Sequence, residues 1–96
     1  MIESPETRLR RLKMRSWRRG MKEMDLILGH FADGPLSSLG GADLDAYEAM
    51  LSENDQDLYL WITARINGGA GRGPAQFAAI LDQVAGHAAD RLKPVR

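Results

Sequence analysis

An arginine, a glycine and a glutamate stand close together near position 20, with a further basic and a further acidic residue beside them. Arg19 and Gly20 are adjacent, and Glu23 follows Arg19 by four positions. A guanidinium and a carboxylate form directional, charge-assisted hydrogen bonds, and a glycine lets another backbone approach closely. With Arg18 and Asp25 at their flanks, these residue types favour recognition of another protein at this corner.

Each member of the corner also has a purely structural explanation. The order of Arg19 and Glu23 is the weaker one for a helical ion pair, which contributes at most about 0.5 kcal/mol. An acid such as Glu23 is favoured near a helix N-terminus, and Gly20 suits a turn because it breaks helices and tolerates a positive φ. The residue types alone therefore indicate an interaction surface without identifying its partner.

Patterns for catalysis or metal binding are missing from the sequence. The chain has no cysteine, and His30 and His87 lie far apart without ligand spacing. The glycine-rich segment 67–73 lacks the Lys-Ser/Thr pair of a phosphate-binding loop, and no nucleophile stands beside a base in a known motif. We therefore expect no enzymatic activity, no catalytic residues and no metal.

The formal net charge of +0 conceals a strong asymmetry. Eight of the 13 Lys and Arg residues fall within residues 1–22, whereas residues 23–64 hold nine acids and no Lys or Arg. This separation favours oriented docking on a partner, or equally ion pairing between the chain's own helices. A nucleic-acid-binding helical domain is the first alternative, but an acidic second helix would be repelled from a groove. An antitoxin-like regulatory protein is the second.

Apolar periodicity predicts an all-α fold, a small five-helix bundle forming a single domain over residues 1–96. Ser4 and Pro5 are typical of a helix start, and Pro94 of a stop. The predicted helices cover residues 5–18, 21–32, 42–53, 55–66 and 74–92, with a flexible linker at 67–73. The predicted core comprises Leu9, Leu12, Met21, Met24, Ile27, Leu28, Phe31, Leu44, Tyr47, Met50, Leu51, Leu58, Trp61, Ile62, Phe77, Ile80, Leu81, Val84 and Ala88.

Helical phase places two groups of candidate binding residues on outer faces. The first predicted helix carries four arginines on one stripe, for which we favour a binding ridge over a merely solvated face: Arg8, Arg11, Arg15 and Arg18. On the second predicted helix, Glu23, Leu26 and His30 share the face opposite the core. Leu26 is therefore a candidate exposed apolar contact.

No apolar run in the sequence reaches the roughly 20 residues needed to cross a bilayer, so we expect no membrane insertion. The first residues include two acids and no hydrophobic segment, unlike a signal or transit peptide. We accordingly predict a bacterial cytoplasmic protein rather than a mitochondrial one. A monomer is expected, although an exposed Leu26 leaves room for self-association.

The corner and its surroundings resemble the succinate dehydrogenase flavinylation (FAD assembly) factor family. The hallmark of that family is Arg-Gly-x-x-Glu, filled here by Arg19, Gly20 and Glu23. The likeness extends over about residues 8–66 and includes the block Asn-Asp-Gln-Asp-Leu-Tyr-Leu-Trp at 54–61. Gln56 stands where many relatives have proline, and Gly40-Gly41 replaces a better helix cap, which affects the scaffold more than the site.

The resemblance implies a small five-helix assembly factor without enzymatic activity of its own. Members bind the flavoprotein subunit of succinate dehydrogenase, and in bacteria that of fumarate reductase, and promote covalent attachment of FAD to it. FAD would thus belong to the client protein, and this chain would bind no cofactor stably. The predicted partner-binding residues are Arg19, Gly20 and Glu23, with Arg11, Arg15, Arg18, Asp25, Leu26 and His30 around them.

Overall fold

The computed structural model describes residues 2–69 and 71–91, and helices account for most of them. In these ranges there are five α-helices, two short 3-10 helices and no strand, which confirms the all-α, five-helix prediction. The α-helices are α1 (Pro5–Trp17), α2 (Lys22–Asp33), α3 (Gly41–Met50), α4 (Asp55–Ile66) and α5 (Ala78–Arg91), and the 3-10 helices are η1 (Pro35–Ser38) and η2 (Ala75–Phe77). None of these helices has the length and apolar character that crossing a membrane requires.

Side-chain caps fix two of the helix starts. The Ser4 hydroxyl accepts a hydrogen bond from the Thr7 backbone N–H at 3.2 Å, directly before the proline that opens α1. Asn54 does the same for α4, where its side-chain oxygen accepts from the Gln56 backbone N–H at 2.8 Å. By contrast, the N-cap residue of α3 is Gly40, which has no side chain to cap the helix, as the Gly-Gly pair suggested.

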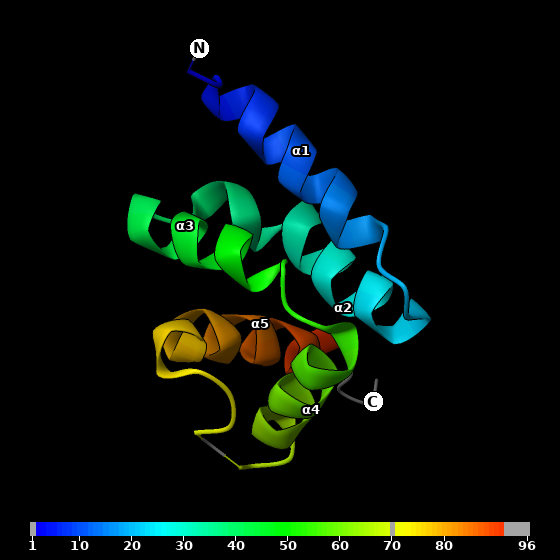
Figure 1. The fold of residues 1–96 in the computed structure, drawn as a ribbon. Helices are drawn as coiled ribbons and strands as arrows, with labels where there is room; N and C mark the ends of the chain where they lie inside the picture. Colours follow the sequence, from blue (N-terminus) through cyan, green and yellow to red (C-terminus); the bar gives the residue numbers. More distant parts are fainter. Residues whose placement is uncertain (1, 70, 92–96) are drawn as a thin grey trace.

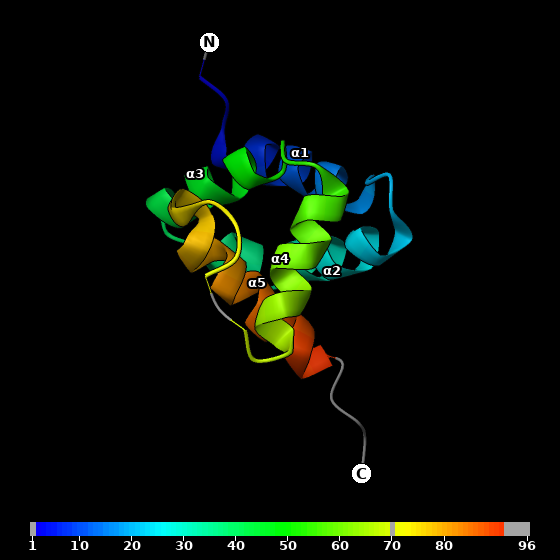
Figure 2. The same cartoon turned by 60° about the horizontal axis from the view of Figure 1, so that its bottom comes forward.

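The central helix of the bundle is α2, which packs against α1, α4 and α5. Figure 1 shows α1 and α2 side by side as an antiparallel pair, with α5 packed against α2 and with α3 at the left, between α1 and α5. In Figure 2, α4 crosses α5, and the turn that precedes α4 passes near the α1–α2 end of the molecule. The buried core lies between these layers and includes Leu12, Met24, Leu28, Phe31, Tyr47, Met50, Leu58, Ile62, Ile80, Leu81 and Val84.

Several predicted core residues lie at the rim rather than inside, and three buried apolar residues were not predicted: Ala32, Leu36 and Ala85. Partly buried residues packed against the core include Leu9, Met21, Ile27, Leu44 and Trp61. Leu36, which the sequence placed in a loop, is 1% exposed and belongs to the core because η1 turns it inward.

Some helix bounds differ from prediction. The third helix ends at Met50 rather than at residue 53, because the Ser52 and Glu53 N–H groups bond three residues back and tighten the chain into a turn. The fifth begins as a 3-10 turn and becomes α-helical only at Ala78, whereas residue 92 lies outside the described residues. In the linker, Gly68, Gly71 and Gly73 have positive φ, the conformation that glycine adopts most readily.

A buried polar network joins α1, α2 and α3. The hydroxyls of Ser16 and Tyr47 lie 2.7 Å apart, and the Tyr47 hydroxyl also donates to the Leu28 carbonyl at 3.3 Å. Burial raises the pKa of Tyr47 to about 12, so the phenol stays protonated and remains a donor. Its ring stacks on Phe31 with centroids 5.4 Å apart, which ties this polar network to the apolar core.

The ring of Trp17 packs directly against Gly29 and so brings α1 and α2 into close contact. A Cβ placed on Gly29 would fall 2.3 Å from the ring of Trp17, so only glycine fits there. The indole N–H of Trp17 donates to an Asp33 carboxylate oxygen at 3.2 Å, and the ring meets His30 edge-on at 5.2 Å. Trp17 is thereby fixed over the middle of α2.

Replacing Gly29 by alanine should lower the free energy of unfolding by about 1–3 kcal/mol, because the added methyl overpacks the Trp17 ring. The matched control is Gly86→Ala, in α5, where an added Cβ meets nothing within 4 Å. The control should gain up to about 1 kcal/mol from helix propensity. Urea unfolding followed by circular dichroism measures both, and equal effects at the two positions would contradict the packing argument.

Candidate functional site

The guanidinium of Arg19 points into the molecule and holds the turn between α3 and α4. Its Nε donates to an Asp55 carboxylate oxygen at 2.7 Å, and its two terminal nitrogens donate to the Leu51 and Glu53 carbonyls at 2.7 and 3.2 Å. The Arg19 side chain is only 9% exposed. Arg19 therefore positions the corner through internal bonds, whereas the sequence suggested a guanidinium presented to a partner.

Two carboxylates fix the backbone of the corner. Asp55 uses its second oxygen to accept from the Gly20 backbone N–H at 2.8 Å, so that one side chain holds both Arg19 and Gly20. Asp25 accepts a hydrogen bond from the Arg19 backbone N–H. The linker between α1 and α2 is therefore tied to the start of α4 and to the first turn of α2.

Gly20 is not required by the fold. Its φ is not positive, which corrects the expectation that a left-handed turn explains this glycine. A Cβ at this position would meet only the Asp55 carboxylate oxygen at 3.6 Å, an ordinary van der Waals distance, and the residue is exposed. What Gly20 contributes is a bare stretch of backbone at the surface.

The charges of Glu23 and Arg18 remain available to a partner. Both residues are exposed, and neither side chain has a hydrogen bond or ion pair with another described residue. The helical pair between Arg19 and Glu23 does not form because the guanidinium is bonded to Asp55 instead. Glu23, at the second position of α2, thus presents an unpaired carboxylate beside the bare backbone of Gly20.

A shallow hollow of about 410 Å³ lies at this corner, between the α1–α2 linker and the start of α4. It is lined by Gly20, Met21, Asn54, Asp55 and Gln56. No group of three or more His, Cys, Asp or Glu residues that could hold a metal ion occurs in the part of the chain that the structure describes. The corner therefore combines a hollow with exposed polar groups of the backbone and side chains.

Two of the four arginines in the predicted ridge on α1 are engaged within the molecule. Arg8 pairs with Asp45 at 2.7 Å and with Glu48 at 2.9 Å, and Arg11 pairs with Glu48 and Glu3, each at 2.9 Å. Hydrogen bonds to these carboxylates raise the pKa of both guanidinium groups. Arg8 and Arg11 therefore form ion pairs between α1 and α3 within the molecule. Such internal pairing was the alternative to partner docking that the sequence left open.

The other predicted contacts lie in different places. Arg15 has one long hydrogen bond of 3.4 Å, from its guanidinium to the Ser52 hydroxyl. Leu26 is 45% exposed, as expected. Together with His30 it lines a separate hollow of about 70 Å³ between α2 and the end of α5, where Arg91 lies 3.4 Å from the His30 ring nitrogen. Leu26 and His30 therefore do not belong to the hollow at Gly20.

Sequence reasoning missed Asp55 as a member of the corner. The residue opens α4, where an acid is explained by the helix dipole alone, and so its bonds to Arg19 and Gly20 were not anticipated. The signal available was the position of Asp55 inside the block at 54–61 that also carried the family resemblance.

Fold and site together define a small helical protein whose exposed corner offers a bare backbone and a Glu23 carboxylate without a partner among the described residues. One partly buried ion pair, Arg19–Asp55, and a hydrogen bond to Asp25 hold this corner in place. The chain belongs to the family described as "Flavinator of succinate dehydrogenase", whose model matches residues 10–87. This confirms the resemblance seen in the sequence. The roles of Arg19, Gly20 and Glu23 toward a partner stay predictions.

Curated relatives carry a consistent name. The chain is 44% identical over 61 residues to "Succinate dehydrogenase assembly factor 2, mitochondrial" of Meyerozyma guilliermondii, covering 64% of this chain and 45% of that protein. Proteins of the same name from Candida glabrata and Debaryomyces hansenii are 43% and 41% identical over the same length, 64% of this chain and 40% and 43% of theirs. The chain therefore spans less than half the length of these relatives.

The predicted bacterial cytoplasmic location is wrong on this comparison. The relatives from Meyerozyma guilliermondii, Candida glabrata and Mycosarcoma maydis are all named as mitochondrial proteins, which points to the mitochondrion instead. The earlier prediction depended on the composition of the first residues of the sequence, and that composition does not determine where the protein resides.

Asp55→Ala should lower the free energy of unfolding by about 2–4 kcal/mol, because it leaves the nearly buried Arg19 guanidinium without its carboxylate and the Gly20 N–H without its acceptor. The matched control is Asp45→Ala, which removes a 73% exposed carboxylate from Arg8 while Glu48 remains, and should cost less than about 1 kcal/mol. Chemical denaturation compares the two. Equal losses in the free energy of unfolding would show that the Arg19–Asp55 ion pair stabilises the fold no more than an exposed ion pair does.

The ion pairs of Glu48 predict a pH dependence of stability. Hydrogen bonding to Arg11, and then to Arg8, lowers the pKa of Glu48 from its ordinary value of 4.5. A carboxylate whose pKa is lower in the folded state stabilises the fold at pH values above its unfolded-state pKa. This stabilisation is lost as the pH falls through the folded-state pKa. Glu48→Gln should therefore cost about 1 kcal/mol at pH 7, and the difference from wild type should shrink in the range below about pH 4.

The control for this measurement is Glu23→Gln, since Glu23 has no side-chain partner among the described residues. Its effect on the free energy of unfolding at pH 7 should be smaller than that of Glu48→Gln, because only the helix dipole at the start of α2 favours its charge. A Glu48→Gln difference that stays constant between about pH 7 and pH 3 would contradict the assigned ion pairs.

Proposed function

We propose that this chain acts as an assembly factor that binds the flavoprotein subunit of succinate dehydrogenase and promotes covalent attachment of FAD to it. The observation that carries this proposal is the match of residues 10–87, which include the whole corner, to a family described as flavinators of that enzyme. The names of the curated relatives support it. Fumarate reductase is proposed as a second client on the resemblance alone.

The mechanism we propose is a shift in the client's conformational population, without catalytic groups supplied by this chain. FAD stays with the client, and the helper favours the conformation in which the flavin and the acceptor side chain are aligned. The helper must bind that conformation more tightly than competing ones, by about 1.4 kcal/mol for each tenfold change in their ratio. The absence of a nucleophile–base motif from the sequence is consistent with this division of labour.

The corner residues divide the docking task between them. Glu23 accepts hydrogen bonds from the client, because its exposed carboxylate has no competing partner among the described residues. Gly20 lets the client backbone approach the linker, since no side chain stands in the way. Arg19 acts indirectly, by fixing the linker through Asp55 and the carbonyls of the α3–α4 turn. One monomer is proposed to bind one client subunit.

The function is tested by producing the flavoprotein subunit with and without this chain. Protein-bound flavin is then followed by its fluorescence after denaturing electrophoresis, since only covalently attached flavin survives denaturation. The proposal expects a clear rise in bound flavin, and co-purification of the two proteins, when the chain is present. Equal flavin in both samples, with no co-purification, would refute it.

Gly20→Leu should weaken client binding while leaving the fold intact. The leucine Cβ has room beside Asp55, and the backbone is not left-handed, so helical circular dichroism and the free energy of unfolding should change little. A side chain on the docking backbone should weaken binding to the flavoprotein subunit at least about tenfold by steric exclusion. Gly86→Leu, at an exposed and open site on α5, should bind normally. Unfolding of Gly20→Leu would show that this glycine is structural.

A further inference from the structure

A second surface lies on the outer face of α1 and ends at the corner. It is a groove of about 450 Å³ lined chiefly by one methionine and five arginines: Met14, Arg10, Arg11, Arg15, Arg18 and Arg19. We call it the arginine groove. Among the residues that the structure describes, no acid lines it. The stripe expected from the sequence contained Arg8 and lacked Arg10 and Met14, so this surface differs from the predicted ridge.

Three of the five arginines in the groove are free of carboxylate partners. Arg10 and Arg18 are exposed and have no side-chain partner in the described part of the chain, and Arg15 has only its long bond to the Ser52 hydroxyl. Arg11 and Arg19 are neutralised by Glu3, Glu48 and Asp55. The groove therefore keeps an uncompensated positive charge, although the whole chain has a formal net charge of +0.

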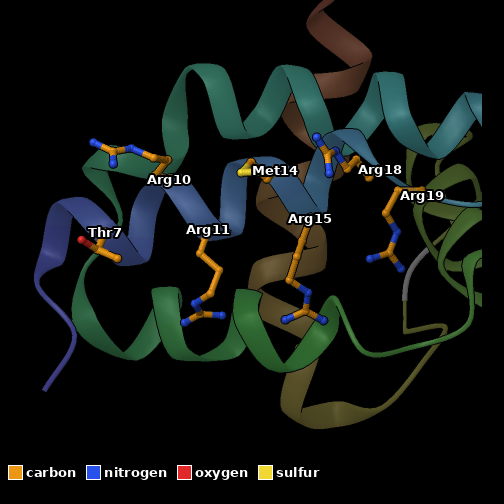
Figure 3. A pocket seen from close by; sticks show the side chains of 7 residues that line it. All are labelled: Thr7, Arg10, Arg11, Met14, Arg15, Arg18 and Arg19. Carbon is orange, nitrogen blue, oxygen red and sulfur yellow. The ribbon is translucent and has the colours of Figure 1, made fainter. Parts of the chain in front are cut away.

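The arrangement of the side chains adds an apolar floor to this charge. Met14 is 47% exposed and lies in the middle of the groove. In Figure 3, Arg11 and Arg15 extend toward α3, whereas Arg10 and Arg18 lie on the side of α2, with Met14 between Arg10 and Arg18. A flexible thioether between guanidinium groups suits an apolar side chain flanked by carboxylates.

The groove also has a defined length and an end at the proposed docking corner. Arg10 lies on α1 and Arg18 caps its C-terminal end eight residues later, which corresponds to about 12 Å along the helix axis. That distance equals about two turns of a partner helix or four residues of an extended strand. Because Arg19 lines the groove and Gly20 follows it, one partner can contact both surfaces at once.

We propose that the arginine groove is a second contact site for the client, and that it takes an acidic segment of about two helical turns with an apolar residue at its centre. The identity of the client is taken from the proposed function above. The free charges steer the client toward the groove, Met14 receives the apolar side chain, and the corner then engages.

A polyanion such as duplex DNA fits these observations less well. Its phosphates would contact the arginines but leave Met14 without an apolar partner. Beyond the corner, the first turns of α2 and α4 carry Glu23, Asp25, Asp55 and Asp57, which disfavour an extended anionic backbone that continues past the groove. The carboxylates of a short acidic segment contact only the groove, so these acids do not repel them.

The test combines charge reversal with photocrosslinking, using the purified flavoprotein subunit as the probe. The variant Arg10→Glu with Arg18→Glu should weaken binding to the client at least about tenfold and reduce its dependence on salt concentration. Arg72→Glu is the control, because Arg72 is an exposed arginine outside the groove. Circular dichroism verifies that each variant is folded. A photoreactive amino acid at Met14 should label a carboxylate-rich client peptide, and one at Leu60, 55% exposed on α4, should not.

The outcomes separate this inference from the proposed function. If the unmodified chain binds the client but the double charge reversal binds equally well, or the crosslink at Met14 falls on a segment without acids, the groove is not a client site while the function stands. If the unmodified chain does not bind the client, both proposals fail. Micromolar binding of a fluorescent DNA duplex at physiological salt, lost in the double variant, would overturn the inference in favour of a polyanion.

Discussion

The ion pair between Arg19 and Asp55 joins the two halves of the molecule. Arg19 follows the end of α1, and Asp55 begins α4, so one contact at 2.7 Å links the α1–α2 pair to the α3–α4 turn. The guanidinium and the carboxylate are 9% and 18% exposed, and their remaining hydrogen bonds go to backbone groups of the same corner. A partly buried pair of this kind holds its position only when all its partners are present, which makes the corner rigid.

This rigidity explains how an exposed linker can serve as a docking surface. Loops that contact partners are usually mobile, and fixing them on binding costs conformational entropy. Here the entropy is lost on folding, because Asp25 and Asp55 hold the backbone of residues 19 and 20 before any partner arrives. Under the proposed function, the client would meet a surface already in its binding conformation, beside a Glu23 carboxylate that has no partner among the described residues.

Charge separation along the chain serves both folding and docking. Arg8 and Arg11 bind acids of α3, and the Trp17 ring on Gly29 seals α1 against α2. These contacts use one side of α1 and fix its orientation. The arginines that remain without carboxylate partners then face outward together, and a chain with zero formal net charge presents a locally basic groove.

The sequence by itself determined the helices and the location of the corner. Periodic apolar residues such as Leu28 and Phe31 predict helices because burial at 3.6-residue spacing is a local property, and the caps at Ser4 and Asn54 mark helix starts for the same reason. The family resemblance also lay in consecutive residues. Helix ends were less accurate, since the turn after Met50 depends on what packs against it.

Only the tertiary structure decided what the charged side chains do. Arg19 lies four residues from Glu23 and 36 residues from Asp55, yet it pairs with Asp55 because folding brings the α1–α2 linker against the start of α4. Arg8 and Glu48 likewise come together only through folding. Position 29 requires glycine because the Trp17 ring, on another helix, packs against it. Long side chains choose partners by three-dimensional distance, and sequence spacing gives that distance only within one helix.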